Sequence, residues 1–162
     1  MFHSRSLACK KPYGAAPAGM KVEFAAYPRR EQGISRMTLW VEEDGQQAEA
    51  YPMRWFGLAG ARDEYGASFT PPHAGLYWYW FTFDTADGPR FCARGYGGRC
   101  EVLDSMGDRF QLTVYDPSYQ PPRWFGEGIT YNIFPDRFCR DRDPVQPEGE
   151  GIAPRVLHEN WD

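Results

Sequence analysis

An aromatic run, LYWYWFTF from Leu76 to Phe83, has the residue types best suited to bind a ligand. Because alternate side chains of a strand point to opposite faces, Tyr77, Tyr79, Phe81 and Phe83 would share one face, and Leu76, Trp78 and Trp80 the other. One face must fill a core, and the other is too apolar to meet water uncovered. Trp78 and Trp80 therefore either contact another domain or form a carbohydrate-binding platform, because the apolar face of a pyranose lies flat on indole.

Oxygen ligands for calcium are a second possibility, because four acidic residues crowd the end of the chain: Asp136, Asp141, Asp143 and Glu148. Arginines interleave with them, which favours a solvated, ion-paired loop. The three histidines, His3, His73 and His158, are far apart in sequence and none suggests a triad. The glycines at 95, 97 and 98 precede no helical pattern, which argues against a phosphate loop. We therefore predict no catalytic residue, no metal site and no cofactor.

Short alternating runs separated by Gly and Pro predict strands rather than helices. The expected strands are 21–26, 37–42, 48–55, 65–70, 76–83, 89–94 and 109–115. Pro52 places the third at a sheet edge or a bulge. This spacing predicts an all-β fold, an antiparallel immunoglobulin-like β-sandwich over residues 1–116. The side chains expected in its core are Phe24, Leu39, Tyr79, Phe81, Leu112 and Val114.

The composition excludes several classes of function. The 162 residues carry a net charge of −4, and the scattered basic residues give no nucleic-acid footprint. No apolar run could span a membrane, and the first residues do not resemble a signal peptide, so we expect a cytoplasmic protein. The four cysteines include no CxxC pair. Cys92 and Cys100 could meet across a loop, but a reducing compartment favours free thiols.

The segment WFGEGITYNIFPDRF, residues 124–138, resembles the start of the catalytic barrel in glycoside hydrolase family 13. The similarity is to the neopullulanase, cyclomaltodextrinase and maltogenic amylase branch, with Asn132 where Gln is usual. The runs KPYG (11–14), GLYWY (75–79) and QLTVYDP (111–117) are similar to landmarks of the family 34 carbohydrate-binding-module-like sandwich that precedes this barrel. VLHENWD (156–162) is similar to a segment that follows the first barrel strand.

The resemblance implies a sandwich at 1–116, a linker at 117–128 and, at 129–162, the truncated start of a (β/α)8 barrel with a strand at Ile129–Phe134. A complete barrel needs about 250 residues, and in this family the nucleophile, the acid/base and the supporting carboxylate lie on later strands. The resemblance makes calcium possible in the parent enzyme, but the family's calcium motif is altered here, with arginine at 140 and 142, so that a calcium site in this chain is doubtful.

We therefore expect a non-catalytic accessory region, either carbohydrate-binding or domain-packing, of a retaining enzyme that hydrolyses α-glucans such as starch, pullulan, cyclodextrin or maltooligosaccharides. The alternative is a free-standing carbohydrate-binding or interaction module. The expected partners are an α-glucan oligosaccharide, bound weakly, and the catalytic barrel. Exposure of 129–134 would also favour a homodimer.

Overall fold

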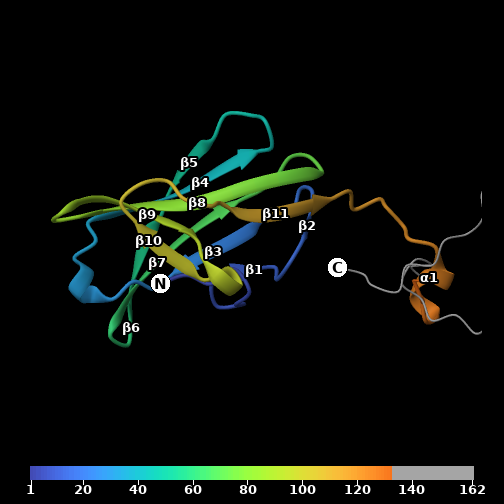
Figure 1. Ribbon diagram of the computed structural model, residues 1–162, viewed down its shortest axis with the longest axis horizontal. Coiled ribbons are helices and arrows are strands. Elements are labelled where there is room, and N and C mark those ends of the chain that lie inside the picture. The colour runs from blue at the N-terminus through green and yellow to red at the C-terminus, as the bar shows by residue number, and fades with distance from the viewer. Residues whose placement is uncertain (133–162) are drawn as a thin grey trace, which may run out of the picture. The chain divides into compact units, whose positions relative to one another are not determined.

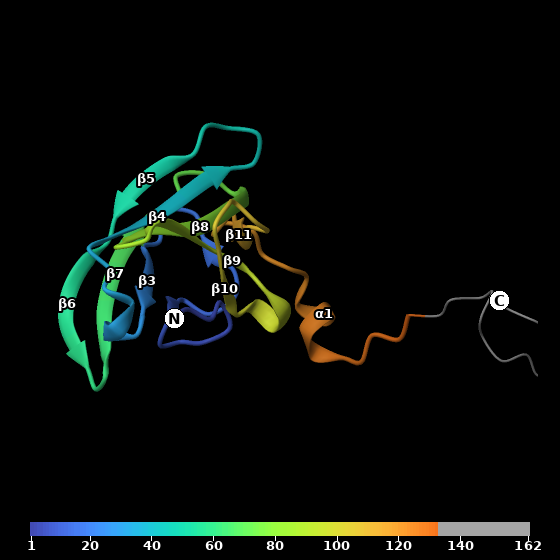
Figure 2. The same ribbon diagram turned by 60° about the vertical axis from the view of Figure 1, so that its left-hand side comes forward.

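The computed structural model describes residues 1–132 and divides the chain into two units, Met1–Gln120 and Pro121–Asp162. The first unit is an all-β sandwich of two sheets (Figures 1 and 2). The smaller sheet has the strand order β1 (Lys10–Lys11), β3 (Val22–Ala26), β7 (Arg62–Phe69) and β6 (Arg54–Ala59). All its pairs are antiparallel.

The larger sheet is organised around its longest strand, β8 (Gly75–Thr85). One edge of β8 is covered by β4 (Arg36–Glu43), which in turn pairs with the edge strand β5 (Glu49–Pro52). The other edge is divided between β9 (Gly88–Arg94) and β11 (Phe110–Tyr115), and β10 (Cys100–Leu103) lies beyond β9. β2 (Ala16–Pro17) pairs with β11 only at Val114 and Tyr115. The edge of β11 is thus uncovered by a strand from 110 to 113.

The core lies between the two sheets and follows the alternation of the sequence. All six side chains predicted to be buried are confirmed, with exposed fractions of 0–3%: Phe24, Leu39, Tyr79, Phe81, Leu112 and Val114. The aromatic rings of Phe24, Tyr79 and Phe81 meet edge-on or tilted. Phe2 of the N-terminal segment packs against Tyr79, Phe81 and Phe110. Such aromatic contacts add to the hydrophobic stabilisation of the sandwich.

Three features depart from the predicted sandwich. The β2–β11 pair is parallel, whereas the sequence predicted an antiparallel sandwich throughout. The expected strand 48–55 is two strands, β5 and β6, because the chain leaves the larger sheet at the buried Met53 and enters the smaller one. The β6–β7 hairpin projects from the sandwich (Figure 2), and a β-bulge interrupts its register between Trp55 and Gly57.

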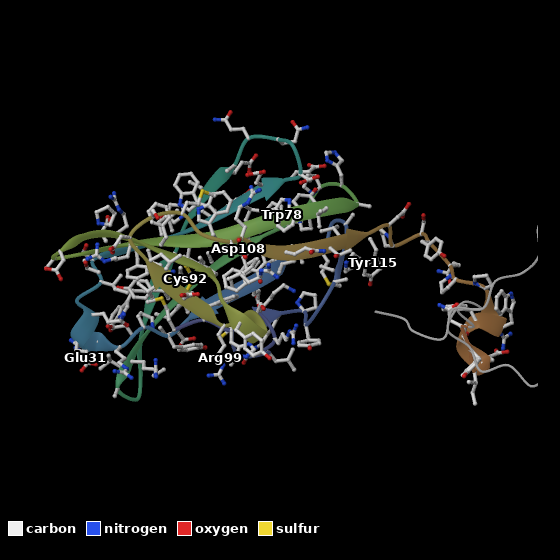
Figure 3. The ribbon with its side chains drawn as sticks, in the orientation of Figure 1. Glu31, Trp78, Cys92, Arg99, Asp108 and Tyr115 are labelled. Carbon is white, nitrogen blue, oxygen red and sulfur yellow. A yellow bond between two sulfur atoms is a disulfide. The ribbon has the colours of Figure 1, made fainter. Side chains whose placement is uncertain are left out.

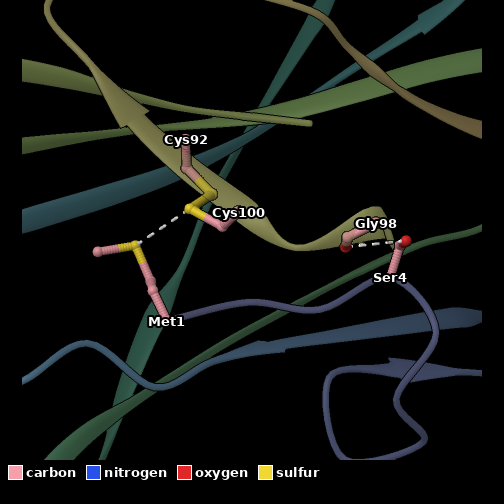
Figure 4. Close-up of a disulfide and its surroundings, with 5 residues drawn as sticks. All are labelled: Met1, Ser4, Cys92, Gly98 and Cys100. Carbon is pink, nitrogen blue, oxygen red and sulfur yellow. Dashed lines mark hydrogen bonds between the residues drawn. A yellow bond between two sulfur atoms is a disulfide. The ribbon is translucent and has the colours of Figure 1, made fainter. Parts of the chain in front are cut away.

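The prediction of free thiols at Cys92 and Cys100 is wrong, because the structure joins them in a disulfide (Figure 4). The β9–β10 pairing brings their Cα atoms to 5.4 Å, a separation that a disulfide spans. The prediction of free thiols rested on an expected reducing compartment and did not include this strand register. Cys9 is a free, buried thiol.

The second unit begins with a short helix, α1 (Arg123–Glu127), inside the expected linker. An Arg123–Glu127 ion pair with an N–O distance of 3.2 Å spans this single turn. Residues 129–132 belong to no helix or strand, so the predicted barrel strand is absent over its described part. A barrel strand draws its backbone hydrogen bonds from strands on both sides, and an isolated strand is not stable in water.

Residues 133–162 lie outside the described residues, and with them the end of that strand and the candidate calcium ligands at 136, 141, 143 and 148. Within 1–132, no helix is long and apolar enough to cross a membrane.

Candidate functional site

The two predicted carbohydrate-binding residues lie on the outer face of the larger sheet, opposite the core. Trp78 and Trp80 alternate along β8 with the buried tyrosines, as the sequence predicted. The structure adds Trp40 of β4, which stands opposite Trp80 in the register, and Arg109, which precedes β11. Trp40, Trp78, Trp80 and Arg109 together form the tryptophan face (Trp78 is labelled in Figure 3).

The rings of the tryptophan face are ordered by contacts with one another. Trp40 and Trp80 are stacked, with ring centroids 6.2 Å apart and planes inclined by 5°. The guanidinium carbon of Arg109 lies 5.3 Å from the centroid of Trp78 and 5.9 Å from that of Trp80. A cation over a ring at this range is stabilising by about 0.5–1 kcal/mol. Arg109 thus covers both indoles.

Two of the three indole N–H groups of this face, and its arginine, are paired within the protein. The indole N–H of Trp40 donates to the Thr82 hydroxyl at 2.9 Å, and that of Trp78 to the Asp44 carboxylate at 2.6 Å. Arg109 donates to the Glu42 carboxylate at 2.5 Å, and both side chains are partly buried. Of the three indole N–H groups, only that of Trp80 has no hydrogen-bond partner within residues 1–132.

Exposure differs between the two predicted residues. Trp80 is only 8% exposed, whereas Trp78 is half-buried. A sugar could stack on the rim of Trp78, but it would meet Trp80 only at an edge unless Arg109 moved. Beside Trp40 a hollow of about 360 Å³ extends over Thr38, Pro52 and the Arg36–Asp84 ion pair. The sequence already contained one signal for Trp40, since it occupies an outward position between Leu39 and Val41.

The other candidate residues do not assemble into a site. His73 lies 3.4 Å from a Glu43 oxygen at the surface, and the His3 ring accepts a hydrogen bond from the Arg5 backbone. Within residues 1–132, no group of three or more His, Cys, Asp or Glu side chains is placed to hold a metal ion.

Comparison with solved structures identifies the class of fold. A cyclomaltodextrinase aligns with 86% of this chain and 24% of its own, with a TM-score of 0.51 and 21% sequence identity. The likeness shows that the two share a fold. No protein-family profile matches the chain.

The sequence comparison confirms the resemblance to α-glucan hydrolases. The amylopullulanases of Thermoanaerobacter thermohydrosulfuricus and Thermoanaerobacterium saccharolyticum are each 26% identical to the chain over 94% of its length. A third homologue is the amylopullulanase of Thermoanaerobacterium thermosulfurigenes, also 26% identical. The chain spans only 11%, 13% and 9% of these three proteins, about a tenth of each.

Proposed function

We propose that the chain is the non-catalytic N-terminal accessory region of an α-glucan hydrolase, an immunoglobulin-like sandwich that precedes the catalytic barrel. One observation carries this proposal. The match to amylopullulanases runs along 94% of the chain, yet corresponds to about a tenth of those enzymes. A segment of that size is far smaller than a (β/α)8 barrel, which needs about 250 residues.

Two roles for the tryptophan face follow from this proposal. In the first, it packs against another part of the enzyme. Its support is that Arg109 and the indole N–H groups of Trp40 and Trp78 are already paired, so the face offers mainly apolar surface. In the second, Trp78 and Trp80 bind an α-glucan weakly, with a dissociation constant of about 1 mM, which corresponds to about −4 kcal/mol. Its support is the accessible rim of Trp78.

Two measurements test the proposal. Incubation of the protein with starch, pullulan or cyclodextrin should release no reducing sugar above a blank, and release by pure protein would contradict a non-catalytic role. Affinity electrophoresis in gels containing amylopectin should retard the chain relative to gels without glucan. Loss of retardation in Trp78→Ala would assign binding to the tryptophan face. Unchanged retardation in both Trp78→Ala and Trp80→Ala would show that the tryptophan face does not bind glucan, and would favour its packing role.

A further inference from the structure

A second surface of the sandwich has the opposite character. Along the uncovered edge of β11, two adjoining hollows of about 590 and 300 Å³ lie between this strand, the N-terminal segment and the turn at Tyr96–Gly98. They have Ser4, Arg5 and Gln111 in common, so they form one continuous depression. We name it the edge groove; Asp108, which lines its larger hollow, is labelled in Figure 3.

An unsatisfied hydroxyl lies at the smaller hollow. Tyr79 contributes to the wall of this hollow, its side chain is fully buried, and its hydroxyl has no hydrogen-bond partner in the described part of the chain. It is the sole buried side-chain polar atom of residues 1–132 left in this state. A buried hydroxyl without a partner costs about 1–3 kcal/mol. The hydroxyl is closed off from solvent, so a ligand hydroxyl must shift the wall of the hollow to reach it, and the new hydrogen bond would then remove that cost.

Each hollow carries one exposed tyrosine ring on a constrained backbone. Tyr96 is fully exposed on a glycine-rich turn, where Gly98 has φ 83° and its carbonyl accepts hydrogen bonds from the Ser4 hydroxyl at 3.1 Å and the Ser4 N–H at 2.9 Å (Figure 4). Tyr13 is 57% exposed. Its loop is fixed because the buried Lys10 ammonium donates to the carbonyls of Pro12 at 2.9 Å and Gly14 at 2.6 Å. Because the backbone beneath each ring is constrained, a ligand that stacks there has to order only the side chain and not the loop.

The charges of the groove favour a neutral ligand. In the larger hollow, the cations Arg5 and Arg94 are balanced by the carboxylates Glu101 and Asp108. The guanidinium of Arg5 forms no ion pair within the described residues, and the Gln111 amide has only a long contact, 3.4 Å, to Thr113. Planar polar groups of this kind can each hydrogen-bond two neighbouring hydroxyls.

We propose that the edge groove binds a linear, hydroxyl-rich α-glucan oligosaccharide, with sugar rings stacked on Tyr13 and Tyr96 and hydroxyls bonded to Arg5, Gln111 and Tyr79. The ligand class rests on the proposed function, whereas the position of the site rests on the groove itself. This site is distinct from the tryptophan face, since it lies along the edge of β11.

The test is a titration of the whole chain with maltoheptaose, followed by amide NMR. We expect the largest shifts at Gly97, Gly98 and Gln111. We expect Tyr13→Ala and Tyr96→Ala each to weaken binding about tenfold, the effect of losing about 1.4 kcal/mol of stacking. Tyr79→Phe should weaken binding about threefold while raising the stability of the free protein, because it removes the orphan hydroxyl. A merely structural tyrosine would not give these opposite signs.

Tyr119→Ala, which removes an exposed tyrosine away from the groove, is the matched control and should bind like the wild type. Binding that survives all three groove variants but is lost in Trp78→Ala would overturn the groove and leave glucan binding intact. Absence of binding by the wild type would overturn glucan binding altogether. The two failures are thus distinguishable.

Discussion

The tryptophan face and the edge groove share the strands β8 and β11 but differ in how their polar groups are treated. On the tryptophan face the indole N–H groups of Trp40 and Trp78 donate to Thr82 and Asp44. Arg109 is held there by Glu42. In the edge groove the Tyr79 hydroxyl is buried without a partner within residues 1–132. A surface whose buried polar groups are paired needs no ligand for them, whereas a buried hydroxyl without a partner calls for an explanation, and a ligand is the one proposed here. The number of aromatic rings alone therefore does not locate a binding site.

The largest expected difference between the tryptophan face and the edge groove is in how much a substitution there lowers the stability of the protein. Trp80→Ala should lower the free energy of unfolding by about 3 kcal/mol, because it removes a buried ring that Trp40 and Arg109 contact. Tyr96→Ala should change it by less than about 0.5 kcal/mol, because that ring is fully exposed. Urea unfolding followed by far-UV circular dichroism measures both. Equal losses would remove the distinction between the two surfaces.

The second prediction concerns Lys10, which fixes the Tyr13 loop. Burial lowers the pKa of Lys10 from 10.5 to about 8. Between these values the unfolded chain binds more protons than the folded one, so stability rises with pH. From pH 7 to 9.5 the gain should be at most about 2 kcal/mol, reduced by solvent screening and by the hydrogen bonds that the ammonium donates to Pro12 and Gly14.

The matched control is Lys10→Met, whose unfolding should lack this rise when both proteins are followed by urea titration at each pH. The window ends at pH 9.5 because tyrosines titrate above it, and burial raises the pKa of Tyr51 to about 12. A parallel pH dependence in the two proteins would show that Lys10 is not the titrating group.

The wall of the groove gives a third prediction. Gly98 has φ 83°, and a Cβ there would lie 2.4 Å from the Ser4 hydroxyl. Gly97, in the same turn, has φ 67° but open space around it. Gly98→Ala should therefore cost between about 1 and 2 kcal/mol, and Gly97→Ala no more than about 1 kcal/mol. Thermal unfolding of the two variants compares them, and a larger loss at Gly97 would contradict the contact with Ser4.

The smallest expected effect separates two arginines. Arg109→Met should destabilise the protein by about 1 kcal/mol, because it removes the cation above Trp78 and Trp80 and the partner of Glu42. Arg5→Met should leave stability unchanged but weaken maltoheptaose binding, since Arg5 forms no ion pair in the described chain. Calorimetry measures stability and binding on the same samples. If Arg109→Met were as stable as the wild type and Arg5→Met were destabilised, Arg5 rather than Arg109 would be the structural arginine.

The sequence predicted the parts of the fold that depend on local alternation. Val22–Ala26, Leu76–Phe83 and Phe110–Tyr115 are strands, and Tyr79 and Phe81 face the core, because a period of two in a strand fixes which side chains are buried. The strand predicted at 89–94 was equally local, and it forms β9, which pairs with β8.

What the sequence did not predict depends on contacts between distant residues. The edge groove joins Ser4, Tyr13, Tyr96 and Gln111, which share no period or spacing. Burial of Tyr79 could be predicted, but the absence of a partner for its hydroxyl depends on every neighbour in three dimensions. The Cys92–Cys100 disulfide likewise depends on the β9–β10 register, which the hydrophobic pattern does not predict.

The bulge in β6 has a consequence for how the protein behaves at high concentration. β6 is an edge strand that exposes Trp55, Phe56 and Leu58, the composition of a strand that recruits copies of itself into aggregates. The shift of register between Trp55 and Gly57 bends the strand and interrupts its row of free backbone groups. An incoming strand would find no continuous ladder to extend. The hairpin can therefore present three large apolar side chains to solvent while resisting fibre growth.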